Sequence, residues 1–401
     1  MNRRHDIDTL RVLAFGLLIL YHAGMLYVAP VADWGFNLKS SYLAEWLTSP
    51  MLFLNRWRME LLFLISGLAV HFLRGHASLA RLAGKRSMRL LLPLVFGMLV
   101  VVPVQPYAQG VTEHAIAPGF LAFLPHYWTH NYRDYGLTWS HLWYLPYLWL
   151  YTMALLVMLP ALESDLGQRL RSGIQRLHGA ALVLAPALPL LLAGTLRHRY
   201  PENHALLGDW YAHALYFTMF LYGYLLGTDH GLWAELARLR RASLATALTC
   251  FALYLFLDKF AGALIHRPLT HTTVLIAGWL IEALRYTYCW SAIAAILGWG
   301  HAYLNRPFRW LPYAREAVYP WYVLHQSVMF LVAYWLLPLR WGPVLEPALV
   351  LLGTVSGCAL LHEFVIRRTR WLRPLFGLDA KPRMLADTSQ MASEPLLKPQ
   401  N

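Results

Sequence analysis

Apolar runs of about twenty residues recur along the whole chain, and shorter polar segments separate them. A run of this length, coiled as an α-helix, spans about 30 Å of hydrocarbon. The pattern therefore predicts an all-α, polytopic integral membrane protein with about ten transmembrane helices. The expected spans cover residues 10–30, 52–73, 90–107, 141–162, 179–196, 212–228, 242–257, 272–298, 317–338 and 347–366.

The domain organisation follows from where this pattern stops. Residues 1–377 are expected to form one transmembrane domain. Residues 378–401 are rich in polar residues and proline, which predicts a disordered cytoplasmic tail. Asp6, Asp8 and Arg11 crowd the start of the first span, and no small-x-small cleavage site follows it. The first span is therefore predicted to be a retained helix and not a signal peptide.

The distribution of Lys and Arg predicts the orientation in the membrane. With the N-terminus in the cytoplasm, the inside segments hold 23 Lys and Arg residues, whereas the outside loops hold 7. Because positively charged loops resist translocation, both termini are expected on the cytoplasmic side, with an even number of spans. Topology and contact with anionic lipid also account for the net charge of +13, so nucleic-acid binding is not indicated.

Composition narrows the class of protein further. Charged residues make up 14% of the chain and hydrophobic residues 58%, against about 25% charged residues in an ordinary soluble domain. This composition therefore argues against a water-soluble monomer. Cys250, Cys289 and Cys358 all lie in apolar segments, without the spacing of a disulfide framework or a zinc site. No metal is expected.

Ionisable side chains inside the spans are the candidates for chemistry, because each costs at least about 2.5 kcal/mol at mid-membrane. Arg11 and His22 are separated by about 16 Å along the first span and share one helix face. Asp8, one turn before Arg11, is positioned to pair with it. The other ionisable residues within spans are Arg58, Glu60, Glu282, Arg285, His325 and Glu363.

Several of these residues also have a purely structural interpretation. Arg11 can anchor the inner end of its span, and His22 can be a hydrogen-bonded packing residue. Arg86 and Arg89 lie one turn apart at the start of the third span. They suit either positive-inside flanking or a cytoplasmic clamp for phosphate, which guanidinium groups bind bidentately.

Two further segments carry polar side chains near predicted outer ends of spans. Glu60 lies one turn after Arg56, so the pair suits an interfacial salt bridge as well as an active site. His141 and Trp143 open the fourth span, where an aromatic belt is expected. Each segment alone is compatible with ordinary packing.

Taken in order, these segments resemble the motifs of the integral-membrane acyltransferase-3 family, from about Asp6 to Gly377. Asp8-Thr9-Leu10-Arg11 followed by His22 is similar to the family's first-span signature, in which the histidine is regarded as catalytic. The other segments that resemble family motifs are Arg58 with Phe63-Leu64-Ile65-Ser66-Gly67, Arg86 and Arg89 before Pro93, Ser140-His141-Leu142-Trp143, Tyr322-Val323-Leu324-His325, and His362-Glu363 leading to Leu375-Phe376-Gly377. Within the family, the chain is most similar to the periplasmic glucan succinyltransferase branch, known as glucans biosynthesis protein C.

The resemblance implies transfer of an acyl group from cytoplasmic acyl-CoA to a carbohydrate hydroxyl on the periplasmic side of a bacterial inner membrane. A neutral imidazole suits proton removal from a hydroxyl, so His22 is expected to be the general base. An acyl-histidine intermediate is the alternative. Arg86 and Arg89 are expected to bind the donor's phosphates, and Arg11 to line the donor's path.

The remaining roles are assigned by position. Arg58 is expected to stabilise negative charge on the thioester oxygen, with Glu60 or Glu363 orienting it. Four residues are expected to line the acceptor side or the active site, namely His141, Trp143, His325 and Glu363. Succinyl-CoA or acetyl-CoA acts as a co-substrate, no bound cofactor is expected, and the partners are the lipid bilayer and a periplasmic glucan or envelope polysaccharide.

Three alternatives stay open at this stage. The chain could be a secondary transporter for a glycan precursor or organic anion, in which the intramembrane charges form the substrate path. It could be a non-catalytic membrane subunit of an envelope polysaccharide machine, in which case His22→Ala leaves glycan acylation intact. It could also be another type of membrane O-acyltransferase whose catalytic histidine is His325, which a comparison of His22→Ala with His325→Ala would distinguish.

Overall fold

The computed structural model describes residues 4–29, 36, 38–74, 78–227, 229–264 and 270–380. These residues form helices and no β-sheet, which confirms the all-α prediction. The α-helices are α1 (His5–Met25), α2 (Thr48–Arg74), α3 (Leu79–Phe96), α4 (Val104–Thr112), α5 (Phe120–Thr129), α6 (Tyr144–Glu163), α7 (Asp165–Gln175), α8 (Gly179–Leu184), α9 (Ala187–Gly194), α10 (Trp210–Leu226), α11 (His230–Leu264), α12 (His271–Tyr303), α13 (Leu311–Leu336) and α14 (Leu345–Leu360). Short 3₁₀ turns cover Glu45–Leu47, Tyr132–Asp134, Ser140–Trp143, Leu337–Leu339 and Pro374–Phe376, and π-helical turns cover Gly97–Val101 and Leu361–Ile366.

The helices confirm a multi-pass membrane protein. Seven segments of the described chain are long and apolar enough to cross a bilayer, or eight if the bent α7 and α8–α9 pair forms one span. The seven are His5–Met25, Leu79–Thr112, Ser140–Glu163, His230–Lys259, Thr272–Tyr303, Leu311–Leu339 and Leu345–Ile366. The predicted number of about ten is not confirmed.

Three of the predicted spans account for the difference. α2 contains Asn55, Arg56, Arg58 and Glu60, which make its N-terminal half polar. α10 has 17 residues, which gives a length of about 25 Å and falls short of a 30 Å hydrocarbon layer. The predicted span 179–196 is interrupted between α8 and α9.

The first and last described residues lie at the same end of the helix bundle. Arg4, at the start, and Leu378 and Asp379, near the end, line one cavity there. This arrangement agrees with an even number of crossings, and the cytoplasmic location of that end stays a prediction. The predicted tail, 378–401, lies outside the described residues from 381 onward.

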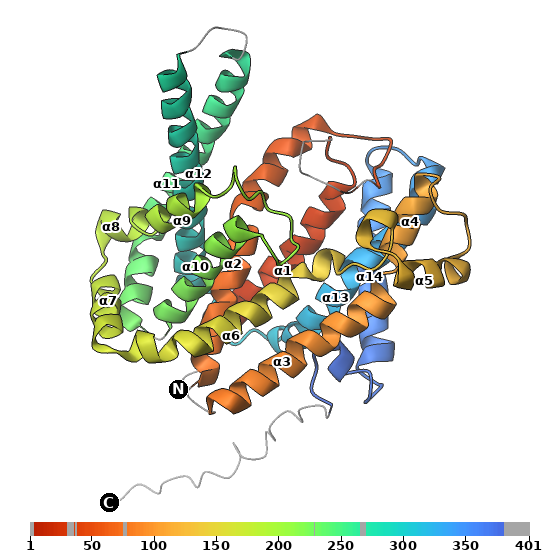
Figure 1. Cartoon of the computed structure of the whole chain (residues 1–401), viewed down its shortest axis with the longest axis horizontal. Coiled ribbons are helices and arrows are strands. Elements are labelled where there is room, and N and C mark those ends of the chain that lie inside the picture. Colours follow the sequence, from red (N-terminus) through yellow and green to blue (C-terminus); the bar gives the residue numbers. More distant parts are fainter. Residues whose placement is uncertain are drawn as a thin grey trace, which may run out of the picture.

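The helix that carries Arg11 and His22 is central to the fold. α1 packs against α2, α12 and α13, and Figure 1 shows it crossing the middle of the bundle. Lys39, from the segment after α1, donates hydrogen bonds to the carbonyl oxygens of Met25 at 2.7 Å and Val28 at 3.2 Å. Burial lowers the pKa of Lys39 below its ordinary value. These bonds fix the end of α1 close to His22.

Two glycines allow α2 and α10 to cross in direct backbone contact. A Cβ on Gly67 would lie 1.9 Å from the carbonyl oxygen of Phe220, and a Cβ on Gly223 would lie 1.9 Å from that of Leu64. Small residues permit such close approach between helices in membranes. The crossing therefore depends on glycine at both positions.

A break in regular helix geometry places α4 against α13. Pro93 lies within α3, and the π-helical turn Gly97–Val101 follows it. Both features disturb the regular hydrogen-bond pattern of a helix. α4 then packs against α13, which brings Gln105 into the interior.

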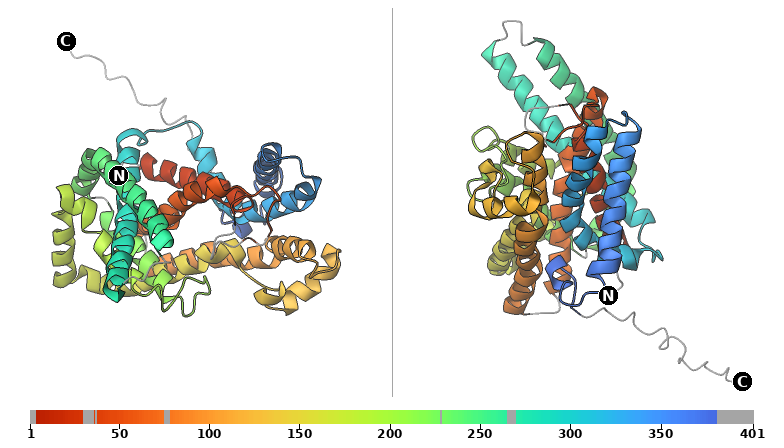
Figure 2. Two further views of the ribbon diagram at one scale, coloured as in Figure 1. Left: turned by 90° about the horizontal axis from the view of Figure 1, so that it is seen from above. Right: turned by 90° about the vertical axis from the view of Figure 1, so that its right-hand side faces the viewer.

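The remaining features concern the outside of the bundle. α11 and α12 form a helical pair that projects past the other helices, as Figures 1 and 2 show.

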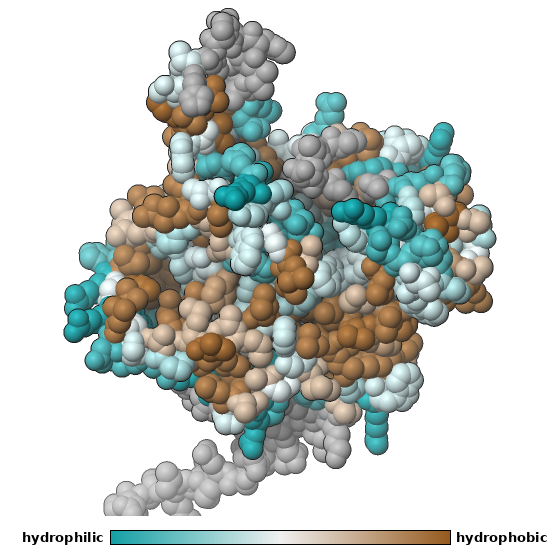
Figure 3. All heavy atoms as spheres, in the orientation of Figure 1, coloured by the Kyte–Doolittle hydropathy of each residue, from teal (hydrophilic) through white to brown (hydrophobic). Residues whose placement is uncertain are grey.

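Figure 3 shows hydrophobic side chains gathered over the middle of the face in view, with hydrophilic ones toward its ends. Exposed apolar residues of α3, α5 and α6 include Val95, Leu121 and Val157. Lipid is the solvent that suits such a surface.

Candidate active site

A cavity of about 1970 Å³ lies at the end of the bundle that carries both ends of the described chain. Its walls come from α1, α2, α3, α6, α13 and the turns that follow α14. Four carboxylates and nine arginines line it. The arginines are Arg4, Arg11, Arg86, Arg89, Arg309, Arg315, Arg367, Arg368 and Arg373. The cavity therefore suits an anionic ligand.

Carboxylates neutralise part of this charge on the α13–α14 side. Glu316 pairs with Arg367 at 3.4 Å and with Arg373 at 3.3 Å. Glu363 lies 2.7 Å from Arg367, and this hydrogen bond raises the pKa of Arg367 above its ordinary value. Glu363 was predicted to line the acceptor side or to orient Arg58. The structure places it in the arginine-lined cavity with Arg367 as its partner.

Asp8 holds two further arginines. It lies 3.6 Å from Arg11 and 3.2 Å from Arg315. The pairing of Asp8 with Arg11, predicted from their spacing, is therefore present. It holds Arg11 in the wall of the cavity, on the path predicted for the donor.

Arg86 and Arg89 line the same cavity from α3. The Nε and Nη2 atoms of Arg86 are shielded from solvent and have no hydrogen-bond partner among the described residues. A guanidinium group in this condition is ready to bind an anion, because leaving buried donors unpaired is costly. The structure thus brings the predicted donor-binding residues and Arg11 to one cavity.

Three aromatic side chains form the inner end of the cavity, toward the centre of the protein. Phe15, Tyr144 and Tyr322 line it, and the ring of Tyr322 lies 5.5 Å from Phe15 and 6.1 Å from Tyr144. The Tyr322 ring also lies 6.2 Å from His325. Tyr322 therefore separates the arginines from a group of histidines.

His22 and His325 are in direct contact. Nδ1 of His22 lies 2.8 Å from Nε2 of His325, and the two rings are nearly parallel, with an interplanar angle of 5° and centroids 5.0 Å apart. On its other side, Nδ1 of His325 lies 2.8 Å from the carbonyl oxygen of Tyr322 and 3.2 Å from that of Trp321.

These contacts determine which nitrogen of His22 carries a proton. A carbonyl oxygen only accepts hydrogen bonds, so Nδ1 of His325 is the protonated nitrogen. In a neutral imidazole the other nitrogen is an acceptor, so Nε2 of His325 accepts from Nδ1–H of His22. With both rings neutral, Nε2 of His22 is left with a free lone pair, as a general base requires.

His141 belongs to the same group but has a different environment. Its ring lies 5.1 Å from that of His325, and its Nε2 lies 3.1 Å from the carbonyl oxygen of Val323. Its Nδ1 lies 3.1 Å from Nε2 of Gln105, which can donate to it. Both ring nitrogens are therefore occupied, which suits positioning rather than proton transfer.

Gln105 organises the polar side chains around His141. Its Nε2 also donates to Oγ of Ser327 at 2.8 Å. Its Oε1 accepts from Oγ of Ser140 at 2.6 Å and from Nε2 of Gln326 at 2.8 Å. Gln105 and Gln326 were absent from the sequence-based candidates, which were chosen by charge. The signals were an amide within the apolar run 90–107 and the Gln326-Ser327 pair directly after His325.

Arg58 lies next to this histidine group. Its guanidinium carbon is 3.5 Å from the ring centroid of Tyr21, whose ring lies 5.9 Å from that of His22. Asn55 donates a hydrogen bond to the Tyr21 hydroxyl at 2.9 Å. Nε and Nη1 of Arg58 have no hydrogen-bond partner among the described residues. Two donors are thus available beside the candidate base.

The other two predicted residues form no hydrogen bond or ring contact with His22 or His325 in the described chain. Glu60 is buried in α2, and its Oε2 has no hydrogen-bond partner within the described chain. Trp143 stacks on His204 with ring centroids 4.0 Å apart. No group of three or more His, Cys, Asp or Glu side chains in the described segments is arranged to hold a metal ion.

The order of these residues along α1, α2, α3, α6 and α13 agrees with a family assignment. The acyltransferase domain of the acyltransferase-3 family matches residues 4–363. The chain belongs to the acyltransferase-3 family. Comparisons with curated proteins and with solved structures gave no match.

Membership of the acyltransferase-3 family gives the general reaction class, acyl transfer by a multi-pass membrane protein. The match covers the histidine group and six of the nine arginines that line the cavity. It extends from Arg4 to Glu363, so all ten predicted site residues fall within it.

Proposed function

We propose that this acyltransferase moves an acyl group from cytoplasmic acyl-CoA to a hydroxyl of an envelope glycan, with His22 as general base. The observation that carries the proposal is the position of Tyr322. Its ring lines the arginine cavity and lies 6.2 Å from the ring of His325, the partner of His22. A donor anchored among the arginines can therefore extend toward the histidines.

Donor binding is assigned to the deep arginines of the cavity. Arg86 has unpaired donors, and Arg89 and Arg11 share the lining with it. Phosphate groups and guanidinium groups form short, charge-assisted hydrogen bonds. Arg11 and His22 are about 16 Å apart along α1. A long, flexible thioester arm would cover this separation while its phosphates stay at the arginines.

The chemical step uses His22 as the base and Arg58 as the hydrogen-bond donor to the thioester oxygen. The acceptor hydroxyl oxygen forms a bond to the thioester carbonyl carbon while Nε2 of His22 takes the hydroxyl proton. The carbon–sulfur bond breaks, and the proton passes from His22 to the thiolate, which leaves as free CoA. Arg58 donates hydrogen bonds to the thioester oxygen as negative charge develops on it.

The acyl group, the acceptor and the membrane are assigned as part of the same proposal. Acetyl and succinyl groups are both compatible with the site, and the acceptor is a periplasmic glucan or another envelope polysaccharide. The enzyme would work in a bacterial inner membrane with the arginine cavity on the cytoplasmic side, as the distribution of Lys and Arg predicts. Acyl-CoA is a co-substrate in this scheme.

Mass spectrometry of envelope glycans tests the proposal. Glycans are compared from cells with the gene deleted and from deleted cells that carry either wild type or His22→Ala. A mass increment that disappears on deletion, returns with wild type and stays absent with a membrane-inserted His22→Ala supports acyl transfer and identifies the acyl group.

Two outcomes would reject the catalytic role of His22. If deletion removes no substituent, the chain does not acylate these glycans, and a transporter for an anionic ligand becomes the better hypothesis. If His22→Ala restores the increment in full, the chain acts as a structural subunit or uses another histidine. His325→Ala then separates these two cases.

A further inference from the structure

A second group of polar side chains lies between α2, α10, α12 and the segment 195–209. We call it the Glu202 cluster, and it consists of Arg58, Glu60, Glu202, Tyr211, Tyr216 and Arg285. Arg58, Glu60 and Arg285 are exposed by only 6%, 7% and 8%. Charged side chains are rarely this buried unless they are paired.

The contacts within the Glu202 cluster leave donors and acceptors unused. Tyr216 donates its hydroxyl proton to Oε1 of Glu202 at 2.6 Å, and Arg285 donates to the Tyr211 hydroxyl at 3.0 Å. Arg285 also lies 3.5 Å from Glu282. The polar atoms without a hydrogen-bond partner in the described part of the chain include Nε and Nη1 of Arg58, Nη1 of Arg285 and Oε2 of Glu60.

Guanidinium donors and carboxylate acceptors together match the chemistry of hydroxyl groups. A hydroxyl donates one hydrogen bond and accepts others, so it can bridge an arginine and a glutamate. Two hydroxyls on neighbouring carbons can use the paired donors of a guanidinium group and both oxygens of a carboxylate. The ring of Trp143, stacked on His204 at 4.0 Å, adds an apolar face at the edge of the cluster.

The cluster adjoins the candidate base through Arg58. The Arg58 guanidinium lies over the ring of Tyr21 at 3.5 Å, and Tyr21 precedes His22 in α1. Arg58 is therefore the member of the cluster that lies beside Tyr21 and His22. The donor cavity lies on the opposite side of Tyr322.

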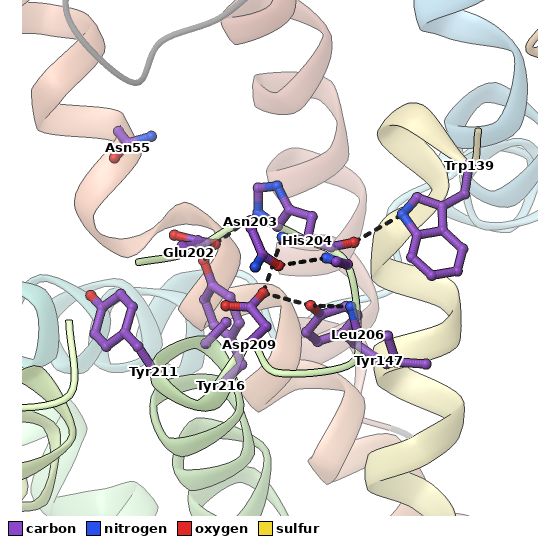
Figure 4. A network of polar contacts seen from close by, with 12 residues as sticks. Asn55, Trp139, Tyr147, Glu202, Asn203, His204, Leu206, Asp209, Tyr211 and Tyr216 are labelled. Atoms are coloured by element: carbon purple, nitrogen blue, oxygen red, sulfur yellow. Dashed lines mark hydrogen bonds and ion pairs between the residues drawn. The ribbon is translucent and has the colours of Figure 1, made fainter. Parts of the chain in front are cut away.

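Hydrogen bonds within the segment that carries Glu202, and from it to Tyr147 and Trp139, fix its conformation, as Figure 4 shows. His204 and Leu206 have φ values of 55° and 65°, a conformation that side chains other than glycine rarely adopt. Asp209 Oδ2 accepts from the His204 backbone N–H at 3.0 Å and from the Tyr147 hydroxyl at 2.6 Å. The Tyr147 hydroxyl accepts in turn from the Leu206 N–H at 3.0 Å.

This segment connects the surface with the interior. The Glu202 side chain is 31% exposed and that of His204 is 39% exposed, whereas the arginines below them are buried. Glu202 is thus the member of the cluster that a ligand meets first from the surface.

We propose that the Glu202 cluster is the acceptor subsite, which binds two neighbouring hydroxyls of the acceptor and presents one of them to His22. The inference rests on the proposed acyl transfer to a hydroxyl. Glu60 and Glu202 accept hydrogen bonds from the acceptor and Arg285 donates to it, while the unpaired donors of Arg58 serve the thioester oxygen.

A pair of simple alcohols tests the subsite. The full chain in lipid nanodiscs is given acetyl-CoA or succinyl-CoA, and release of the CoA thiol is followed with trans-1,2-cyclohexanediol or cyclohexanol as acceptor. The two probes share a ring and differ by one hydroxyl. Wild type is expected to use the diol with a KM at least about tenfold lower than that for cyclohexanol.

Isosteric variants then show which side chains cause the preference for the diol. Glu60→Gln and Glu202→Gln are expected to raise the KM for the diol about tenfold and to leave the affinity for CoA unchanged. Tyr216→Phe removes one hydroxyl only and serves if a glutamate variant does not fold. Glu235→Gln, in the pair with Arg238 on α11, is the control expected to keep the diol preference.

The outcomes separate this inference from the proposed function. Thiol release that depends on His22 but shows no preference for the diol would overturn the subsite alone, as would a full preference retained in all three variants. Absence of any His22-dependent thiol release with either donor would overturn the proposed acyl transfer itself.

Discussion

The rings of His22 and His325 are nearly parallel and meet edge to edge, with Nδ1 of His22 2.8 Å from Nε2 of His325. Because His325 Nδ1 is held by the Tyr322 carbonyl, this contact fixes the tautomer of His22. His325→Ala is therefore expected to lower kcat about tenfold, which corresponds to the loss of one hydrogen bond of about 1.4 kcal/mol. Steady-state kinetics with acyl-CoA measures this change.

A conservative variant shows whether His325 positions His22 through a hydrogen bond or only fills space in the interior. The amide of His325→Gln can donate to the Tyr322 carbonyl and accept from His22, so it is expected to recover part of kcat. His22→Ala is expected to lose a factor on the order of 10² to 10⁴. Equal losses in His325→Ala and His325→Gln, with a parallel rise in the KM for the donor, would assign His325 a packing role.

The unpaired donors of Arg86 lead to a prediction about donor affinity. Hydrogen bonds to charged groups contribute about 1.5–3 kcal/mol, so Arg86→Gln is expected to weaken CoA binding at least about tenfold. Arg367→Gln is the matched control, because Arg367 lines the same cavity but is paired with Glu363 and Glu316. Isothermal titration calorimetry with CoA measures the affinity of both variants. Equal weakening by both variants would contradict a specific clamp at Arg86.

The crossing of α2 and α10 predicts a loss of stability. In Gly67→Ala or Gly223→Ala the new Cβ would lie 1.9 Å from a backbone carbonyl oxygen, so the helices must separate. Overpacking of this kind costs about 1–3 kcal/mol, and the Tm in detergent is expected to fall. Gly16→Ala is the control, because nothing lies within 4 Å of its Cβ. A Tm unchanged in both crossing variants would refute the tight contact.

Glu202 predicts a defined dependence of stability on pH. Partial burial raises its pKa, but the hydrogen bond and charge of His204, the Tyr216 hydroxyl and the charge of Arg285 outweigh this effect, and the pKa of Glu202 lies below 4.5. A carboxyl group with a lowered pKa stabilises the fold fully above its unfolded value, and this contribution is lost as the pH falls through the folded value.

The Tm difference between wild type and Glu202→Gln measures this contribution. It is expected to stay constant from about pH 6 to pH 5 and to shrink below about pH 4.5. Glu60 and Arg58 of α2 also belong to the cluster, so the same scan on Glu60→Gln controls for their effects. A Tm difference that is independent of pH down to about pH 3 would exclude a charged Glu202 as the stabilising group.

Periodicity and spacing predicted the parts of the site that lie on one helix. Arg11 and His22 share a face of α1 because eleven residues make about three turns, and the Asp8–Arg11 pair forms at i,i+3 as expected. The number of spans was less predictable. α10 is short and α2 is polar in its N-terminal half, and helices packed inside a bundle need neither the length nor the apolar surface of a lipid-facing one.

The tertiary part of the site could not be predicted from local pattern. Gln105, Ser140 and Gln326 are neutral polar residues on different elements, and only the packing of α4 against α13 and the turn before α6 brings them together. Glu202 and Asp209 lie in a segment between helices, where acidic residues are ordinary. Glu363 was a candidate because it is a charged residue within an apolar run. In the structure it forms an ion pair with Arg367, which explains the charge at this position without a catalytic role.

The walls of the arginine-lined cavity come from both ends of the described chain, since Arg4 and Arg11 precede or lie within α1 while Arg367 and Arg373 follow α14. During synthesis, the early helices enter the membrane long before the later ones. The cavity is therefore incomplete until α14 has been inserted and has folded back against α13. A nascent chain presents only the arginines that precede α14, so the full positive charge of the cavity arises only in the finished protein.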